Sequence, residues 1–228
     1  MGRCALDPPG MILLFSGGID SYVAWHYLYN PQTVYFDLNT PYSEKEKRVV
    51  KKLIPSTIIE SVIDFSTRQK GDHAFVPYRN LHLALLANEY ADHIVIAGLK
   101  DDMVNDKNQT VFRQFSYLMS DMTKRKIIVM SPFWHMTKEQ VVGWFLENGG
   151  TKEQLLSTIS CYTKTKKKYC GKCPACFRKW CALRANGIDD LPFHNIPLML
   201  EYKDKAEKGV YIPERNKTIL KELKRYGI

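Results

Sequence analysis

The sequence predicts an α/β protein built on a five-stranded, doubly wound parallel sheet, with a small helical subdomain at its C-terminal end. Apolar runs alternate with helical patterns as far as about residue 150, which is typical of a sheet wound on both faces by helices. Two of the runs, HIVIAG and KIIVM, are continuously apolar, as expected for parallel strands covered on both sides. Beyond residue 150 the chain is helical, rich in lysine and carries clustered cysteines.

Five apolar runs are expected to form the strands of this sheet. They cover residues 11–15, 33–38, 56–65, 93–98 and 126–132. Helices are expected over 20–30, 77–91 and 137–150, where apolar side chains recur at helical spacing. Pro77 suits the first turn of the second helix, Thr137 can cap the third, and glycines end it.

The composition is that of a globular protein, because 45% of the 228 residues are hydrophobic and 25% are charged. We expect a loose leader over residues 1–10, an α/β domain over 11–150 and the helical subdomain over 151–228. No apolar stretch approaches the roughly 18 to 20 residues needed to span a bilayer, and the start lacks the apolar core of a secretory signal. These features predict a cytoplasmic protein without a membrane partner.

The formal net charge of +9 suits either a nucleic acid or a small anionic ligand. The basic residues are spread along the chain and include lysine-rich helix faces such as SEKEKRVVKK, residues 43–52. This distribution favours a solvated basic surface and an anionic ligand over dedicated nucleic-acid binding.

The stretch FSGGIDS follows the first predicted strand and predicts a phosphate-binding loop. Gly17 and Gly18 let the backbone turn sharply and direct N–H groups at an anion, and the helix that begins near Asp20 adds its dipole. Ser16 and Ser21 can donate to phosphate oxygens, while Asp20 can hold magnesium or cap the helix. The spacing is neither that of a Walker loop nor that of a dinucleotide fingerprint, and a purely structural Gly-Gly turn is the alternative. The nucleotide is expected to contact Phe15, Ser16, Gly17, Gly18, Ile19, Asp20 and Ser21.

Four cysteines, Cys161, Cys170, Cys173 and Cys176, have the spacing C-x8-C-x2-C-x2-C and predict a zinc site. In a cytosolic chain, clustered cysteines favour a metal over disulfides. An iron–sulfur site that uses Cys181 in place of Cys161 is an alternative, although its last gap is too long and no proline follows. Unligated thiols are another alternative. With zinc, Cys181 is left as a buried free thiol and Cys4 has no assigned role.

Several motifs together carry a family resemblance. They are SGGIDS, VPYRNLHLALLANEYA (76–91), SPFWHMTKEQVVGW (131–144), SCY (160–162) and CGKCPACFRKWCALRANGI (170–188). From about residue 11 to residue 190 the chain resembles the 7-cyano-7-deazaguanine synthases, the queuosine branch of the ATP pyrophosphatases. The resemblance implies an adenine nucleotide alpha hydrolase-like fold, a structural zinc and a homodimer, with FHNIPLMLEY (193–202) as a possible contact. It also implies an ATP- and magnesium-dependent ligase that adenylates 7-carboxy-7-deazaguanine and, with ammonia, converts it through the amide into the nitrile.

The resemblance carries functional roles to individual residues. Arg79 and Asn80 match the R-N of the family's V-P-G-R-N motif, and Arg79 would contact a phosphate or carboxylate or else pair with a surface acid. Lys138 matches a family lysine that would neutralise a phosphate, with an exposed helix-start lysine as the alternative. Phe36 and Asp37, at the end of the second strand, would lie beside adenine. The expected nucleotide-binding set is completed by Gly98 and Arg113.

The chain also departs from the family pattern. Tyr78 replaces the glycine of V-P-G-R-N, and the stretch 98–115 has Arg113 without the preceding residues of the family's Y-P-D-C-R element. Asp101, Asp102 and Asp106 could serve magnesium or the base edge instead, or be solvated. Three other functions therefore stay open. The activated acid could pass to another amine, even a protein amine; the chain could modify tRNA; or it could be an inactive binding module.

Overall fold

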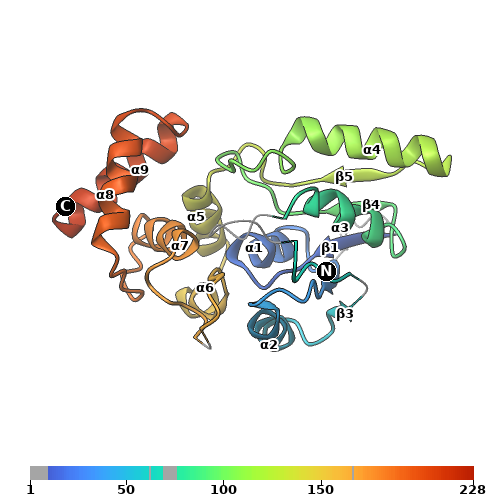
Figure 1. Cartoon of the computed structure of the whole chain (residues 1–228), viewed down its shortest axis with the longest axis horizontal. Helices are drawn as coiled ribbons and strands as arrows, with labels where there is room; N and C mark the ends of the chain where they lie inside the picture. The colour runs from blue at the N-terminus through green and yellow to red at the C-terminus, as the bar shows by residue number, and fades with distance from the viewer. Residues whose placement is uncertain (1–9, 62, 69–75, 166) are drawn as a thin grey trace.

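The computed structural model describes residues 10–61, 63–68, 76–165 and 167–228. The predicted leader therefore lies, except for Gly10, outside the described residues, as does Cys4. Within the described part, five parallel strands form one sheet in the order β3-β2-β1-β4-β5 (Figure 1). They are β1 (Met11–Leu14), β2 (Gln32–Phe36), β3 (Ile58–Glu60), β4 (His93–Val95) and β5 (Ile128–Met130). This order confirms the predicted doubly wound α/β class.

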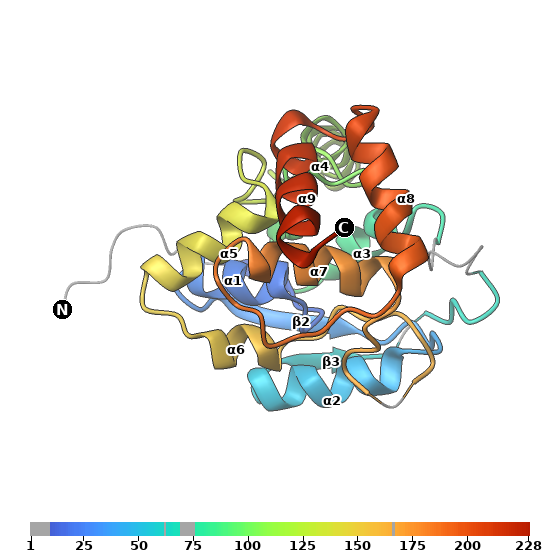
Figure 2. The same cartoon turned by 90° about the vertical axis from the view of Figure 1, so that its left-hand side faces the viewer.

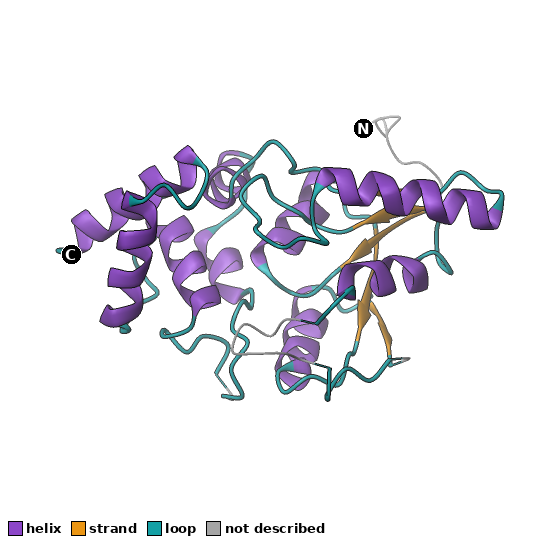
Figure 3. Cartoon of the chain, turned by 45° about the horizontal axis from the view of Figure 1, so that its top comes forward, coloured by secondary structure: helices purple, strands orange, loops and turns teal. Residues whose placement is uncertain are grey.

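Helices follow the strands and then continue alone. The first five are α1 (Ile19–Tyr27), α2 (Ser43–Leu53), α3 (Arg79–Ala87), α4 (Gln109–Thr123) and α5 (Lys138–Glu147). The remaining described helices are α6 (Lys152–Ser157), α7 (Pro174–Arg184), α8 (Ile196–Glu207) and α9 (Pro213–Tyr226). In Figure 3 the last helices gather beyond one end of the sheet, opposite the outer end of α4. No described helix combines the length and the apolar character that crossing a membrane requires.

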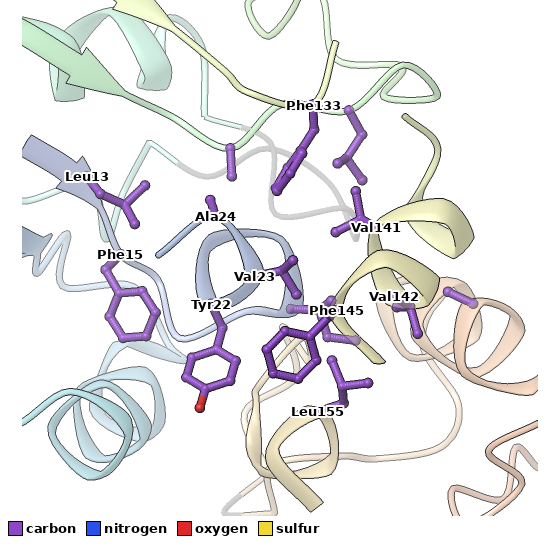
Figure 4. Close-up of a cluster of buried hydrophobic side chains, with 14 of the residues drawn as sticks. Leu13, Phe15, Tyr22, Val23, Ala24, Phe133, Val141, Val142, Phe145 and Leu155 are labelled. Carbon is purple, nitrogen blue, oxygen red and sulfur yellow. The ribbon is translucent and has the colours of Figure 1, made fainter. Parts of the chain in front are cut away.

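Alternate side chains of each central strand serve the two faces of the sheet. On β1, Leu13 packs with α1, α2 and α5, whereas Ile12 packs with α3 and α4. On β4, Val95 and Ile94 divide in the same way. Figure 4 shows the first of these clusters, in which Val23 of α1 and Phe145 of α5 meet between the two helices. Both faces are buried, which explains why these strands read as continuously apolar.

The third strand is much shorter than predicted. It covers Ile58–Glu60, so the expectation of a strand over 56–65 is wrong for most of its length. β3 is an edge strand that pairs with β2, and the last register pair joins Phe36 to Glu60. Since β2 ends at Phe36, the residues after Glu60 do not continue the ladder, and further along the Phe65 N–H donates to the Leu38 carbonyl at 2.9 Å.

The C-terminal helices build a third hydrophobic cluster of their own. Phe177 and Trp180 of α7 pack against Phe193 and against buried side chains of α8 and α9, which lie side by side in Figure 2. In the stretch 193–202, Phe193 and Met199 belong to this cluster, whereas Ile196 and Leu200 are about half exposed. The domain boundary at residue 150 and the homodimer stay predictions.

Candidate active site

A cavity of about 610 Å3 opens at the carboxyl ends of the strands. Ser16 follows β1 into its wall, Phe36 ends β2, and Ile96 follows β4. The first turns of α1, α5 and α7 close other sides, with Asp20, Lys138 and Pro174 among the lining residues. In open parallel sheets ligands bind at this edge, and the volume lies within the roughly 300–1,000 Å3 typical of small-molecule sites.

The phosphate loop has the backbone that its glycines were expected to allow. Gly17 adopts a φ of 71°, and a Cβ atom there would lie 3.2 Å from Cγ1 of Val49. Gly18 is the N-cap of α1, and no side chain caps the N–H groups of that first turn. The Ser21 hydroxyl donates to the Gly18 carbonyl at 3.2 Å and lies 3.3 Å from the Ser16 hydroxyl. The turn thus presents backbone donors and hydroxyls at the cavity, as an anion site requires.

Lys138 reaches across the cavity to the phosphate loop. Its Nζ donates to Oδ1 of Asp20 at 2.6 Å, and the residue is 7% exposed. A capping box between Thr137 and Gln140 fixes the start of α5, so that its first residue points inward. Burial lowers the pKa of Lys138, against the opposing effect of the Asp20 carboxylate. The side chain is therefore not the exposed helix-start lysine of the alternative interpretation.

Arg178, on α7, is a cavity residue that the sequence analysis missed. Its Nη1 donates to Oδ1 of Asp102 at 2.6 Å, and its Nη2 lies 3.0 Å from Oδ1 of Asp101. Lys107 pairs with the same Asp102 at 2.9 Å. Burial alone would lower the pKa of Arg178, but the carboxylates of Asp102, Asp101 and Asp20 together raise it. Asp101 and Asp102 are thus engaged in ion pairs rather than solvated.

Arg79 and Asn80 open helix α3 at the cavity, where both line the wall. The Asn80 amide donates to Oδ1 of Asp106 at 2.9 Å, and its backbone N–H donates to the other oxygen. Tyr78, just before them, has a φ of 57° and is 69% exposed. This left-handed conformation is why a glycine suits that place in the family motif, and the tyrosine adopts it at some conformational cost.

The expected adenine contacts divide between the cavity and its surroundings. Phe36 lines the wall, whereas Asp37 pairs with Lys47 at 2.7 Å and is not among the lining residues. Gly98 is buried beneath Trp134, whose ring would lie 2.4 Å from an added Cβ atom. Arg113 is exposed on α4, away from the cavity lining. The geometry therefore supports a nucleotide contact for Phe36 more than for Asp37, Gly98 or Arg113.

Four tyrosines and a glutamate also line the cavity, and the sequence analysis named none of them as a site residue. Glu46 lies on α2 and lines the cavity. The Tyr35 hydroxyl donates to its Oε2 at 2.9 Å. The rings of Tyr42 and Tyr162 have centroids 5.3 Å apart. Tyr202 of α8 closes the C-terminal side. A spacing signal existed for Glu46, because it lies four residues before buried Val50 on the same helix.

The four predicted metal ligands meet in space. The Sγ atoms of Cys161, Cys170, Cys173 and Cys176 all lie within 4.8 Å of one another. The Cys170 and Cys176 sulfurs are 3.8 Å apart, which matches the roughly 3.8 Å edge of a tetrahedron with Zn–S bonds of about 2.3 Å. Cys181 is buried outside this set. The donor set fits zinc.

The four-cysteine cluster is joined directly to the cavity. Cys173 and the next two residues line its wall, and Arg178 lies one turn further along α7. The first cysteine of the cluster, Cys161, belongs to a separate segment. Two residues before it, the Ile159 N–H donates to the Gly17 carbonyl at 2.8 Å. The four cysteines therefore lie beside two segments that shape the cavity, one of which bonds Gly17.

The sheet order, the glycine turn after β1 and the cavity beside it define an α/β protein of the PP-loop class. The family model described as queuosine biosynthesis protein QueC matches residues 32–187. Because this match covers more than half of the 228 residues, the chain belongs to the QueC family. The match includes Arg79, Lys138, Arg178 and the four clustered cysteines, and it begins after the phosphate loop.

Individual relatives agree with the family assignment. The chain is 29% identical over 218 residues to 7-cyano-7-deazaguanine synthase 2 of Sulfurisphaera tokodaii and 26% identical over 219 residues to the 7-cyano-7-deazaguanine synthase of Sulfolobus acidocaldarius. Each alignment covers 79% of this chain and 46% of the relative, so the chain spans about half the length of those two proteins. The 7-cyano-7-deazaguanine synthase of Rickettsia conorii is 29% identical over 173 residues, or 65% of this chain and 75% of that protein. The predicted resemblance to a divergent member is confirmed.

Proposed function

We propose that this chain is an ATP-dependent synthase that activates the carboxylate of 7-carboxy-7-deazaguanine and converts it to the nitrile with ammonia. One observation carries the proposal: a single cavity joins the phosphate loop to three cationic side chains, Lys138, Arg178 and Arg79. The names of the relatives agree with this chemistry. A nucleoside triphosphate and a carboxylic acid are both anionic, so the cationic side chains of one cavity could contact both of them.

A carboxylate is a poor electrophile, and adenylation makes it reactive. A substrate oxygen attacks the α-phosphorus of ATP, and the bond from that phosphorus to the pyrophosphate oxygen breaks. The backbone donors around Gly18 would hold the departing pyrophosphate. Lys138 and Arg178, held by Asp20 and Asp102, would stabilise the charge that develops around the α-phosphorus.

Ammonia then attacks the acyl carbon, and AMP leaves with the former carboxylate oxygen to give the amide. In a second cycle the amide oxygen attacks the α-phosphorus of another ATP, and pyrophosphate and one amide proton leave. Loss of AMP and of the second proton then gives the nitrile. Both cycles need alignment of two bound molecules more than they need a protein nucleophile. We therefore assign no covalent role to any side chain.

Two metals would support this chemistry. The four clustered cysteines would hold zinc, which would stabilise the segments around Cys161 and Cys173. Magnesium supplies charge neutralisation to the phosphates when bound. Among the described residues, Oδ2 of Asp20 is given no hydrogen bond, because Lys138 engages Oδ1. Asp20 thus retains an oxygen for a cation.

A second candidate keeps the adenylation and changes the acceptor to a larger amine. Met103 and Val104 line the cavity although they are 61% and 38% exposed, so two apolar side chains stand at its rim. They belong to the loop that departs from the family pattern. Ammonia has no apolar surface that could pack against these side chains, whereas the carbon chain of a larger amine would contact them.

The experiment is incubation of the purified chain with 7-carboxy-7-deazaguanine, ATP, magnesium and ammonium. The proposal predicts two AMP and two pyrophosphate molecules for each nitrile formed. Absence of AMP contradicts it. Efficient nitrile formation from free ammonia contradicts the second candidate, whereas amide products with an added larger amine support it.

A further inference from the structure

Glu46 is an ionisable group in the cavity wall that the phosphate chemistry does not use. It faces the same space as the phosphate loop and Arg79. An anionic side chain does not help to hold ATP or a carboxylic acid, because it repels both. Asp20 and Asp102 in the same wall are paired with Lys138 and Arg178, whereas Glu46 forms no ion pair among the described residues, so it suits a ligand that offers hydrogen-bond donors.

The contacts of Glu46 leave one of its oxygens available. The Tyr35 hydroxyl donates to Oε2 at 2.9 Å, and burial keeps that hydroxyl protonated by raising the pKa of Tyr35. The neighbouring Lys45 does not pair with Glu46, because its Nζ donates to the Thr163 carbonyl at 2.5 Å. Among the described residues, Tyr35 is the one hydrogen-bond partner of this carboxylate, and it occupies Oε2 rather than Oε1. Glu46 is only partly buried and lines the cavity, so a ligand bound there could supply a donor to this oxygen.

The raised pKa of Glu46 agrees with the small number of hydrogen-bond donors around its carboxylate. Burial raises its pKa to about 7, against the lowering effects of the Tyr35 hydrogen bond and of the charges on Arg79 and Lys45. A ligand with N–H groups directed at Glu46 would favour the ionised form and supply what the protein does not.

Two aromatic rings stand beside this carboxylate. Tyr42 begins the same helix and is 4% exposed, whereas Tyr162 follows Cys161 and is 42% exposed. Both line the cavity, and their rings are tilted by 52° with centroids 5.3 Å apart. Aromatic faces and a carboxylate together suit a flat heterocycle with an N–H edge.

We propose that Glu46 binds the N–H edge of the 7-deazaguanine ring, accepting from its lactam N–H and its 2-amino group, while Tyr42 and Tyr162 contact the ring. This assignment rests on the proposed function and names the part of the cavity that would select its substrate. The edge of adenine alternates a donor with an acceptor, whereas the guanine-like edge carries two donors side by side. One of these donors would bond the unoccupied Oε1, and the other would bond the second lone pair of Oε2, beside the Tyr35 hydroxyl.

The test compares two acids in two proteins. Wild type and Glu46→Gln are assayed for AMP release with 7-carboxy-7-deazaguanine and with its analogue that lacks the 2-amino group. Wild type should prefer the first acid by about 100-fold or more in kcat/KM, because the analogue leaves a buried acceptor unmatched. Glu46→Gln should reduce this preference to below about 10-fold, mainly through KM for the natural acid.

Two further measurements separate recognition from folding and from nucleotide binding. Calorimetric affinity for α,β-methylene ATP should be unchanged in Glu46→Gln. Glu44→Gln, an exposed change on the same helix, should retain the preference of wild type. Equal turnover of both acids by wild type, or an equal loss of both in Glu46→Gln, overturns the role of Glu46. Absence of AMP from wild type with either acid instead contradicts the proposed function.

Discussion

Lys138 and Asp20 form an ion pair of 2.6 Å between Nζ and Oδ1, although 118 residues separate them in sequence. The pair joins the first turn of α5 to the first turn of α1, immediately after the phosphate loop. It places one cation and one carboxylate at the end of the cavity where the loop directs its backbone donors. This relationship links the PP-loop to the second half of the α/β domain.

Replacing Lys138 should abolish most turnover. Lys138→Met keeps the length of the side chain but leaves Asp20 without its partner and removes a charge from the cavity. We expect kcat/KM for AMP release to fall about 100-fold or more, as for the loss of a preorganised charge. Lys152→Met, which removes a half-exposed lysine paired with Asp190, is the control and should keep the wild-type rate. Unchanged turnover in Lys138→Met would contradict the role given to this pair.

The backbone of Gly17 should be essential to nucleotide binding. Gly17→Ala forces a φ of 71° on an alanine and pushes its Cβ atom to 3.2 Å from Val49. We expect a loss of about 1 to 2 kcal/mol in the free energy of unfolding. The affinity for ATP, measured by calorimetry, should fall more than about tenfold, since the anion site would be distorted.

Gly187→Ala is the matched control for this change. Gly187 has a φ of 75°, but an added Cβ atom there meets nothing within 4 Å. The Gly187→Ala variant should lose a similar amount of unfolding free energy through backbone strain, but its affinity for ATP should equal that of wild type. Equal affinity in both variants would mean that the turn at Gly17 is structural.

Metal content should depend on Cys161 and not on Cys181. Mass spectrometry of the intact protein under native conditions should find about one zinc per chain in wild type and in Cys181→Ser, and none in Cys161→Ser. The physical reason is that Cys181 lies outside the cluster of four sulfurs. A brown protein that loses its metal in Cys181→Ser would instead support an iron–sulfur site.

Glu46 should lower stability at neutral pH. Its pKa is raised from 4.5 to about 7 in the folded state, so the folded protein keeps a proton that the unfolded chain releases in this window. Stability from this group is therefore present below about pH 4.5 and lost as the pH rises to about 7. Glu46→Gln does not titrate, and we expect it to raise the free energy of unfolding by about 1 to 2 kcal/mol at pH 8 and by almost nothing at pH 4. Denaturant unfolding at both pH values measures this, and an equal gain at both would refute the assignment of the proton to Glu46.

Much of the architecture could be predicted from local signals. Continuous apolar runs located β1, β2, β4 and β5, since both faces of each are buried. The long third strand could not be excluded, because its end depends on where β2 leaves the sheet at Phe36. The cysteine cluster was predictable because four ligands lie within 16 residues, from Cys161 to Cys176.

The substrate side of the cavity was much less visible in the sequence. SEKEKRVVKK was interpreted as a solvated lysine-rich face, but Lys45 is 5% exposed and Glu46 lines the cavity. Their spacing of four residues from Val49 and Val50 carried that information. Arg178 stood within a basic run after the cysteines, and its inward direction depends on Asp101 and Asp102, which come from a distant loop.

The fate of the substrate's oxygen tests the central claim most directly. With 7-carboxy-7-deazaguanine labelled with 18O in both carboxylate oxygens, each adenylation should transfer one labelled oxygen to AMP. Mass spectrometry should then find AMP with one 18O in its phosphate, two such molecules for each nitrile. Two results would contradict activation of the acid at the α-phosphorus beside Gly17 and Gly18. They are unlabelled AMP, and ADP formed together with 18O-labelled inorganic phosphate.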